Sequence, residues 1–178
     1  LLNDPVSLEA SPRNTTVKKI RQWAVPVDKK RKPELFLHLL KKNRWGQVLV
    51  FVKTRHGVEE LVTQLAAHGV AADSIHGDKP QPARLRALDR FKAGDVKILV
   101  ATDVAARGLD IDDLPHVVNF DLPIVAEDYI HRTGRTGRAG ASGEAVSLVC
   151  ADEVRQLAAI ETLTKQTLER IEEPGFEP

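Results

Sequence analysis

The sequence lacks the features of secreted, disulfide-rich and membrane-spanning proteins. Its one cysteine, Cys150, excludes a disulfide framework and a cysteine-based zinc site, and suits a reducing compartment. No stretch approaches the roughly 20 apolar residues of a membrane span, and no secretory apolar segment opens the chain. The net charge is only +1, so any basic surface must come from local clustering. We therefore expect a soluble, cytoplasmic protein with no membrane partner.

The phosphate-binding pattern G-x-x-x-x-G-K-[ST] is also missing, so the chain has no loop of its own to cradle a triphosphate. Asp152 and Glu153 follow an apolar run and resemble the acidic Mg²⁺ ligands of such sites. Without the phosphate loop, we interpret them as the first turn of a helix, where negative charge is favoured.

What the sequence does contain is an arginine-rich stretch at residues 131–140, HRTGRTGRAG. Its arginines recur at every third residue, Arg132, Arg135 and Arg138, with glycines between them and no acidic residue. Guanidinium groups hold phosphate oxygens in pairs, and glycine lets the backbone come close to a ligand. Ordered-looking sequence on both sides favours a polyphosphate-binding loop over a flexible arginine–glycine segment. We expect Arg135 and Arg138 to point outward, toward the phosphate groups of a ligand.

The chain has the length of one ordinary domain, and continuous apolar strands alternate in it with helices. This pattern predicts an α/β fold of RecA-like type, a doubly wound parallel sheet of six or seven strands with helices on both faces. We expect the domain to cover residues 17–170, after a linker at 1–16 and before the start of a tail at 171–178. The chain begins with Leu rather than Met, and we interpret it as a fragment. The predicted strands lie at 16–27, 47–52, 70–75, 96–101, 116–120 and 145–150, and helices include 58–67, 82–91 and 152–163.

Polar residues follow three of these strands: 53–55 (KTR), 76–78 (HGD) and 102–103 (TD). Ligands of such sheets bind beyond the carboxyl ends of the strands, so we expect one edge of the sheet to be a working face.

The stretch ATDVAARGLDI at 101–111 forms a second cluster. Thr102 or Asp103 can cap the short helix that follows, and for Asp103 capping and ligand contact are equally open. Asp110 can accept from a sugar hydroxyl, as carboxylates in nucleotide sites do. The alternative is a buried ion pair between Arg107 and Asp110.

Two basic features have a structural and a functional interpretation. Arg84 lies one turn inside a helix and can either hold a nucleic-acid phosphate or stay solvated, and the two are equally open. The run Lys29–Lys32 precedes Pro33, which suits a first helical turn, and we favour a solvated helix entrance over a nucleic-acid contact.

Four stretches, in order, resemble motifs IV, IVa, V and VI of the DEAD-box RNA helicases: VLVFVKTR (48–55), HGDKPQPAR (76–84), ATDVAARGLDI (101–111) and HRTGRTGRAG (131–140). The resemblance implies the second, C-terminal RecA-like domain, without the first domain that carries the Walker loop. DLPHVVNFDLP (113–123) and PGFEP (174–178) are similar to the bacterial RhlE-type branch.

The resemblance also implies roles for single residues. Arg135 and Arg138 match arginines that reach the γ-phosphate of ATP, and His131 and Arg132 match residues that organise the interface with the first domain. Asp110, with Gly108 beside it, matches the carboxylate that contacts the ribose. The positions on the RNA-backbone path are Arg84, Gly77, Thr102, Lys53 and Thr54.

The implied function is half of an ATP-dependent RNA helicase, with RNA and the N-terminal RecA-like domain as partners. The implied cofactor is ATP with Mg²⁺, the metal being held mainly by the N-terminal domain. Without a phosphate loop, the fragment alone should be inactive. One alternative is a non-catalytic module that binds RNA or self-associates, and another is the motor half of a DNA-directed superfamily 2 helicase.

Overall fold

The computed structural model describes residues 20–137 and 143–178. The predicted linker and Arg138 lie outside these ranges. In chain order the elements are β1 (Ile20–Pro26), η1 (Lys29–Arg31), α2 (Lys32–Asn43), β2 (Val48–Phe51), α3 (Arg55–Ala67), β3 (Ala72–Ile75), α4 (Gln81–Lys92), β4 (Ile98–Ala101), α5 (Asp103–Ala106), β5 (His116–Asn119), α6 (Ala126–Thr133), β6 (Gly143–Val149), η2 (Ala151–Glu153), α7 (Val154–Thr164) and β7 (Glu169–Arg170).

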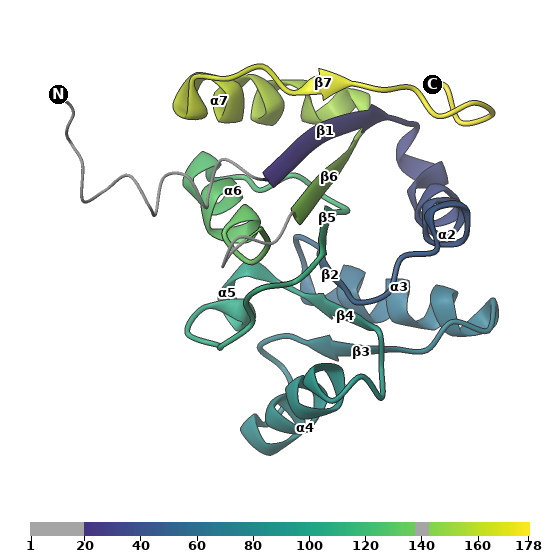
Figure 1. Cartoon of the computed structure of the whole chain (residues 1–178), viewed down its shortest axis with the longest axis vertical. Helices are drawn as coiled ribbons and strands as arrows, with labels where there is room; N and C mark the ends of the chain where they lie inside the picture. The colour runs from purple at the N-terminus through teal and green to yellow at the C-terminus, as the bar shows by residue number, and fades with distance from the viewer. Residues whose placement is uncertain (1–19, 138–142) are drawn as a thin grey trace, which may run out of the picture.

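The strands of the described ranges form one seven-stranded sheet in the order β3-β4-β2-β5-β6-β1-β7 (Figure 1). Every pairing between these strands is parallel. All residues of β2 and β4 are buried, which explains why their sequences are apolar throughout instead of alternating. The prediction of a doubly wound parallel sheet with six or seven strands is confirmed.

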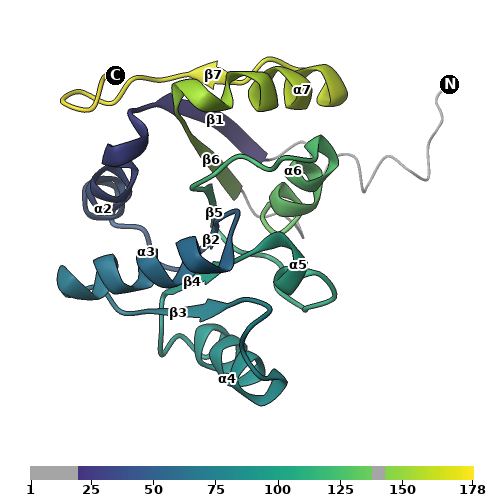
Figure 2. The same ribbon diagram turned by 180° about the vertical axis from the view of Figure 1, so that it is seen from behind.

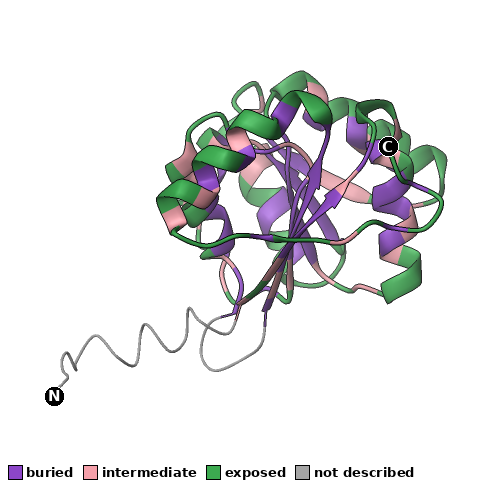
Figure 3. Ribbon diagram, turned by 90° about the horizontal axis from the view of Figure 1, so that it is seen from above, coloured by how far each residue is buried: buried purple, intermediate pink, exposed green. Residues whose placement is uncertain are grey.

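Helices cover both faces of the sheet (Figures 1 and 2). Helices α2 and α3 pack on one face, where Val50 and Val100 join a core with Phe36 and Leu61. On the other face α4 and α5 pack against Leu49 and its neighbours, and α6 and α7 enclose a smaller core that contains Tyr129 and Ile160. Figure 3 shows the buried strands between two largely exposed helical layers.

Some element boundaries differ from the predictions for local reasons. Helix α3 begins at Arg55, earlier than predicted, because the Thr54 hydroxyl accepts a hydrogen bond from the Gly57 backbone N–H at 3.0 Å and caps the helix. The predicted helix from 152 is a short 3-10 turn, η2, followed by α7. Strand β7 was not predicted, since it has two exposed residues and lies at the sheet edge.

Residues 171–178, predicted to start a tail, pack on α2. Phe176 is 7% exposed, and its ring lies under the Arg31 guanidinium at 4.4 Å and beside the His38 ring at 5.0 Å. Glu173 accepts hydrogen bonds from Lys42 Nζ at 2.7 Å and His38 Nε2 at 2.8 Å. Burial acts to raise the pKa of Glu173, but the hydrogen bonds from Lys42 and His38 outweigh it, so the pKa lies below its ordinary value.

We predict that Phe176→Ala lowers the free energy of unfolding by about 3 kcal/mol, because a large buried ring leaves a cavity when it is truncated. Urea denaturation of the variant measures this change. Glu172→Ala, at an exposed position of the same segment, is the matched control and should leave the unfolding midpoint unchanged. Equal stability of the two variants would show that the segment does not belong to the fold.

Candidate functional site

The predicted RNA-path residues lie in loops that follow three adjacent strands. Strands β3, β4 and β2 are neighbours in the sheet, and Gly77, Thr102 and the Lys53–Thr54 pair come directly after them. The Thr102 N–H donates to the Ile75 carbonyl at 3.3 Å. The other two loops are joined by an exposed ion pair, in which Arg55 Nε lies 2.9 Å from Asp78 Oδ2. As expected, the structure brings these predicted residues together at one edge of the sheet.

The two threonines of this edge both cap helices. Thr54 caps α3, and the Thr102 hydroxyl oxygen accepts from the Ala105 N–H at 3.4 Å at the start of α5. A hydroxyl has one donor besides its lone pairs, and neither cap uses it. Both side chains are therefore fixed in place and keep an O–H for an anionic oxygen.

The buried residues His76 and Ser74, together with the exposed carboxylate of Glu59, hold the loop of Gly77. The His76 ring lies 2.6 Å through Nε2 from Glu59 Oε2, while its Nδ1 accepts from the Asp78 N–H at 3.2 Å. Ser74 donates to the same Glu59 oxygen at 2.9 Å. Burial acts to raise the pKa of Glu59, but the hydrogen bonds from His76 and Ser74 outweigh it and the pKa is lowered. Glu59 thus stays ionised at neutral pH and fixes the loop, a supporting role that the sequence analysis missed.

Arg84 is half-buried in the first turn of α4, and its Nη2 donates to Gln81 Oε1 at 2.8 Å. A half-buried, hydrogen-bonded side chain differs from the fully solvated arginine that was one of the two alternatives for Arg84. The adjacent loop of Gly77 lies before the same helix.

Arg132 is buried, with 1% of its side chain exposed. Its Nε and Nη2 donate to the two carboxylate oxygens of Asp103 at 2.6 and 2.7 Å. Its Nη1 donates to Asn119 Oδ1 at 3.1 Å and to the Asp121 carbonyl at 2.6 Å. The guanidinium also lies 4.9 Å from the centre of the Phe51 ring. In this conformation the Arg132 side chain is closed off from solvent and holds the surrounding loops together.

This arrangement decides two alternatives left open by the sequence. Thr102, not Asp103, caps α5, and both carboxylate oxygens of Asp103 accept from Arg132. The alternative of a buried ion pair between Arg107 and Asp110 is excluded: Arg107 lies 3.3 Å from Asp128, and Asp110 lies 3.6 Å from Lys92. Sequence spacing could not supply these partners, because each lies on a different element.

The expected outward orientation of Arg135 is also wrong in this structure. Its Nη1 donates to the Leu109 carbonyl at 2.8 Å and the Ile111 carbonyl at 3.4 Å, and its Nη2 donates to the Ala106 carbonyl at 3.0 Å. Asp112 lies 3.9 Å away. The guanidinium therefore holds the loop on both sides of Asp110. Arg138, its predicted companion, lies outside the described residues.

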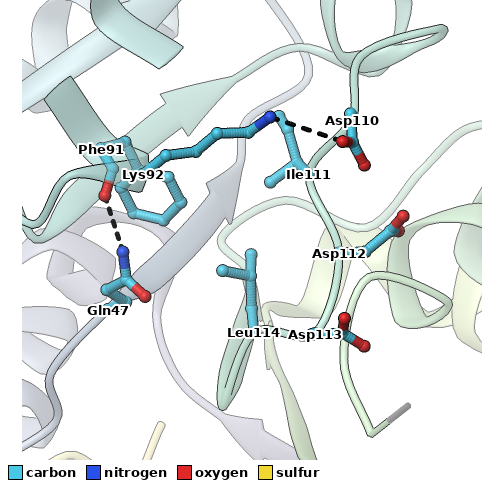
Figure 4. A pocket seen from close by; sticks show the side chains of 8 residues that line it. All are labelled: Gln47, Phe91, Lys92, Asp110, Ile111, Asp112, Asp113 and Leu114. Carbon is cyan, nitrogen blue, oxygen red and sulfur yellow. Dashed lines mark hydrogen bonds and ion pairs between the residues drawn. The ribbon is translucent and has the colours of Figure 1, made fainter. Parts of the chain in front are cut away.

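Asp110 stands at the rim of a hollow of about 300 Å³ (Figure 4). Its side chain is 84% exposed, and Lys92 is its ion-pair partner at 3.6 Å. Figure 4 shows Ile111 and Leu114 pointing into the hollow beside Asp110. Gly108 has φ +75°, a left-handed conformation that favours glycine and turns the chain after α5. The Asp110 carboxylate, which we predict to contact the ribose, is therefore accessible to a ligand.

His131 is exposed at the end of α6, with Nδ1 3.5 Å from Asp128 Oδ1. The crevice between α5 and α6, which Asp103, Arg132 and Arg135 line, has a volume of only about 20 Å³. Ligand sites have volumes of roughly 300–1,000 Å³, so a nucleotide cannot fit inside it. Among the described residues, no group of histidine, cysteine and acidic side chains could hold a metal ion. No helix in the same ranges is long and apolar enough to cross a bilayer.

Comparison with known proteins agrees with this geometry. The family model of the helicase conserved C-terminal domain matches residues 31–140. The DEAD-box ATP-dependent RNA helicase CshA of Geobacillus kaustophilus is 44% identical over 176 residues, which cover 99% of this chain and 38% of that protein. The ATP-dependent RNA helicase SrmB of Haemophilus influenzae is 42% identical over 179 residues, 100% of this chain and 41% of that protein.

The crystal structure of the E. coli DEAD-box protein SrmB, bound to the regulator of ribonuclease activity A, matches with a TM-score of 0.81. The identity is 40%, over 85% of this chain and 90% of that chain. This chain belongs to the family of helicase conserved C-terminal domains. Within it, the chain is the C-terminal RecA-like domain of the DEAD-box type, as the four motifs indicated. The RhlE-type assignment stays a prediction.

We predict that Asp103→Asn lowers the free energy of unfolding by about 3 kcal/mol, because it leaves the buried Arg132 cation without its counter-charge. Urea denaturation measures the loss. Asp95→Asn, an exposed position after α4, removes the same charge and should have no effect. Unchanged stability of Asp103→Asn would mean that the ion pair does not hold these loops together.

Proposed function

We propose that this domain is the second half of an ATP-dependent RNA helicase and works across a cleft with an N-terminal RecA-like domain. The observation that carries the proposal is the attachment of Arg135 to the backbone on both sides of Asp110. Arg135 and Asp110, the two residues predicted to contact the nucleotide, thereby belong to one hydrogen-bonded loop. The chain has no phosphate loop, and the crevice that Arg132 and Arg135 line is too small for a nucleotide, so we infer that the other domain holds the triphosphate.

In the proposed mechanism Asp110 accepts from the ribose of ATP, and Arg135 and Arg138 stabilise negative charge on the transferring phosphoryl group. Mg²⁺, held mainly by the N-terminal domain, neutralises phosphate charge when bound. Arg135 must first release the carbonyls of residues 106, 109 and 111. Domain closure and the phosphate charge supply the driving force for that release. The buried Arg132 then holds the loops around the arginine-rich segment in place, and the exposed His131 contributes to the interdomain contact.

The proposed RNA path crosses the loops after β2, β3 and β4. Thr54 and Thr102 offer hydroxyl donors, Lys53 and Arg84 offer charge, and Gly77 allows close approach of the backbone. Contacts of this kind position a strand without reading its sequence. When both domains hold one strand in a bent conformation, a duplex cannot follow, and the strands separate locally.

Two other functions are distinguished by experiment. A stand-alone module would bind RNA or self-associate without ATP turnover, and a DNA-directed motor would respond to DNA.

We favour a cytoplasmic location, because the single buried cysteine suits a reducing compartment.

We predict that the 178-residue fragment alone does not hydrolyse ATP, whereas the full-length protein is an ATPase that RNA stimulates more than DNA of the same sequence. Steady-state phosphate release with each nucleic acid measures this difference. Robust turnover by the fragment would contradict the proposed division of work between domains. Stimulation by DNA equal to that by RNA would assign the domain to the DNA-directed class.

We predict that Arg138→Ala in the full-length protein lowers kcat for ATP hydrolysis by about 10³-fold or more, the effect of losing an arginine finger. RNA affinity should be largely kept, because the RNA path lies on other loops. Arg155→Ala, at an exposed position of α7, is the control. An unchanged kcat would remove Arg138 from its proposed role.

A further inference from the structure

A groove lies beside the proposed RNA path, between the start of α2 and the first half of α3. Its volume is about 440 Å³, in the range of ligand-binding sites. Lys53 and Thr54 line it, and so do Lys29 and Lys30 of η1. A second hollow of about 550 Å³ adjoins it and shares Lys30 as a lining residue. We name the first of these, the 440 Å³ hollow, the α2–α3 groove.

The α2–α3 groove carries unbalanced positive charge. Lys29, Lys30 and Lys53 are exposed, and within residues 20–137 and 143–178 none of the three has an ion-pair partner. Lys32, by contrast, is buried and lies 2.7 Å from Glu153 and 3.4 Å from Asp121.

The acidic groups of the groove do not balance this charge. Asp121 is already engaged by Lys32 and by the Lys53 N–H at 3.1 Å. Glu60 is then the one remaining carboxylate among the lining residues of the 440 Å³ hollow. A ligand with several negative charges therefore fits this groove.

Apolar side chains also line the groove. Val52 and Leu61 are buried, and Pro33 and Phe120 are half-exposed and border the same hollow. Surfaces of this kind pack against ribose and base faces, while lysines at the rim hold phosphates. The combination matches a single nucleic-acid strand better than a free inorganic anion, which has no apolar surface to bury.

We propose that the α2–α3 groove binds the continuation of the RNA strand beyond the nucleotides held by Thr54, Gly77 and Thr102, with Lys29 and Lys30 on its phosphates. This proposal rests on the proposed function. It replaces the solvated helix entrance that the sequence favoured for these lysines, because they share a hollow with Lys53. An acidic peptide would satisfy the charges, but the direct continuity with the RNA path favours the strand.

The test uses the full-length protein with a non-hydrolysable ATP analogue and labelled polyuridylate oligonucleotides of increasing length. In Lys29→Gln/Lys30→Gln, binding of the shortest oligonucleotides should be unchanged, and the gain in affinity with length should be reduced. For long oligonucleotides, the slope of log affinity against log salt should become shallower by about 1.4, because each phosphate contact to a single strand contributes about 0.7. Fluorescence anisotropy measures both quantities.

Two further variants make the result specific. Lys97→Gln/Lys165→Gln changes the net charge equally at exposed positions before β4 and after α7, and should bind every length as the unaltered protein does. Arg84→Ala, on the proposed RNA path, should weaken binding of every length.

The outcomes separate the two proposals. If the groove variant keeps the full length dependence and salt slope while Arg84→Ala loses affinity, the groove proposal is wrong and the RNA path stands. If Arg84→Ala also binds every length normally, the RNA path itself is wrong, and the groove proposal fails with it. Loss of binding to a polyglutamate peptide, with RNA binding intact, would overturn the proposal in favour of an acidic partner.

Discussion

The buried guanidinium of Arg132 is the constraint on which the candidate site depends. A cation with 1% of its side chain exposed is stable only when its charge is paired with an anion and its N–H donors are hydrogen-bonded. Asp103 supplies the charge, and Asn119 and the Asp121 carbonyl supply further acceptors. These partners come from α5, from β5 and from the loop before α6, so one side chain of α6 ties α5 to the end of a central strand and to the loop that follows it.

The contacts of Arg135 in this structure differ from those that its proposed role at the phosphate requires. Its hydrogen bonds to the carbonyls of residues 106, 109 and 111 contribute roughly 1.5–3 kcal/mol each at best, because the donor is charged but would otherwise bind water. A charged phosphate competes well against neutral carbonyls, because hydrogen bonds between ions are stronger. The resting contact therefore keeps Asp110 and its loop in shape while leaving the guanidinium available to a stronger acceptor.

The fold could be predicted from the sequence because apolar strands and intervening helices report burial directly, as in β2 and β4. The grouping of Lys53, Gly77 and Thr102 at one edge of the sheet could be predicted equally well, because parallel strands end at a common edge. The partner of Asp103 and the orientation of Arg135 could not be predicted, because both depend on side chains brought together from different elements. Phe176 was missed for a related reason: a lone aromatic residue near a chain end has no periodicity to reveal its packing.

Helix α5 connects the proposed RNA path with the proposed nucleotide contacts, although it contains only residues 103–106. Thr102 caps its beginning, Asp103 holds Arg132, and the Ala106 carbonyl at its end accepts from Arg135. A strand that binds Thr102 affects the release of Arg135 only if its binding free energy differs between the two positions of that guanidinium. With three residues between the two contacts and the Asp103–Arg132 ion pair at the first of them, α5 has little freedom to move at one end without moving at the other. The short helix is thus the structural element through which RNA binding and ATP hydrolysis would be coupled.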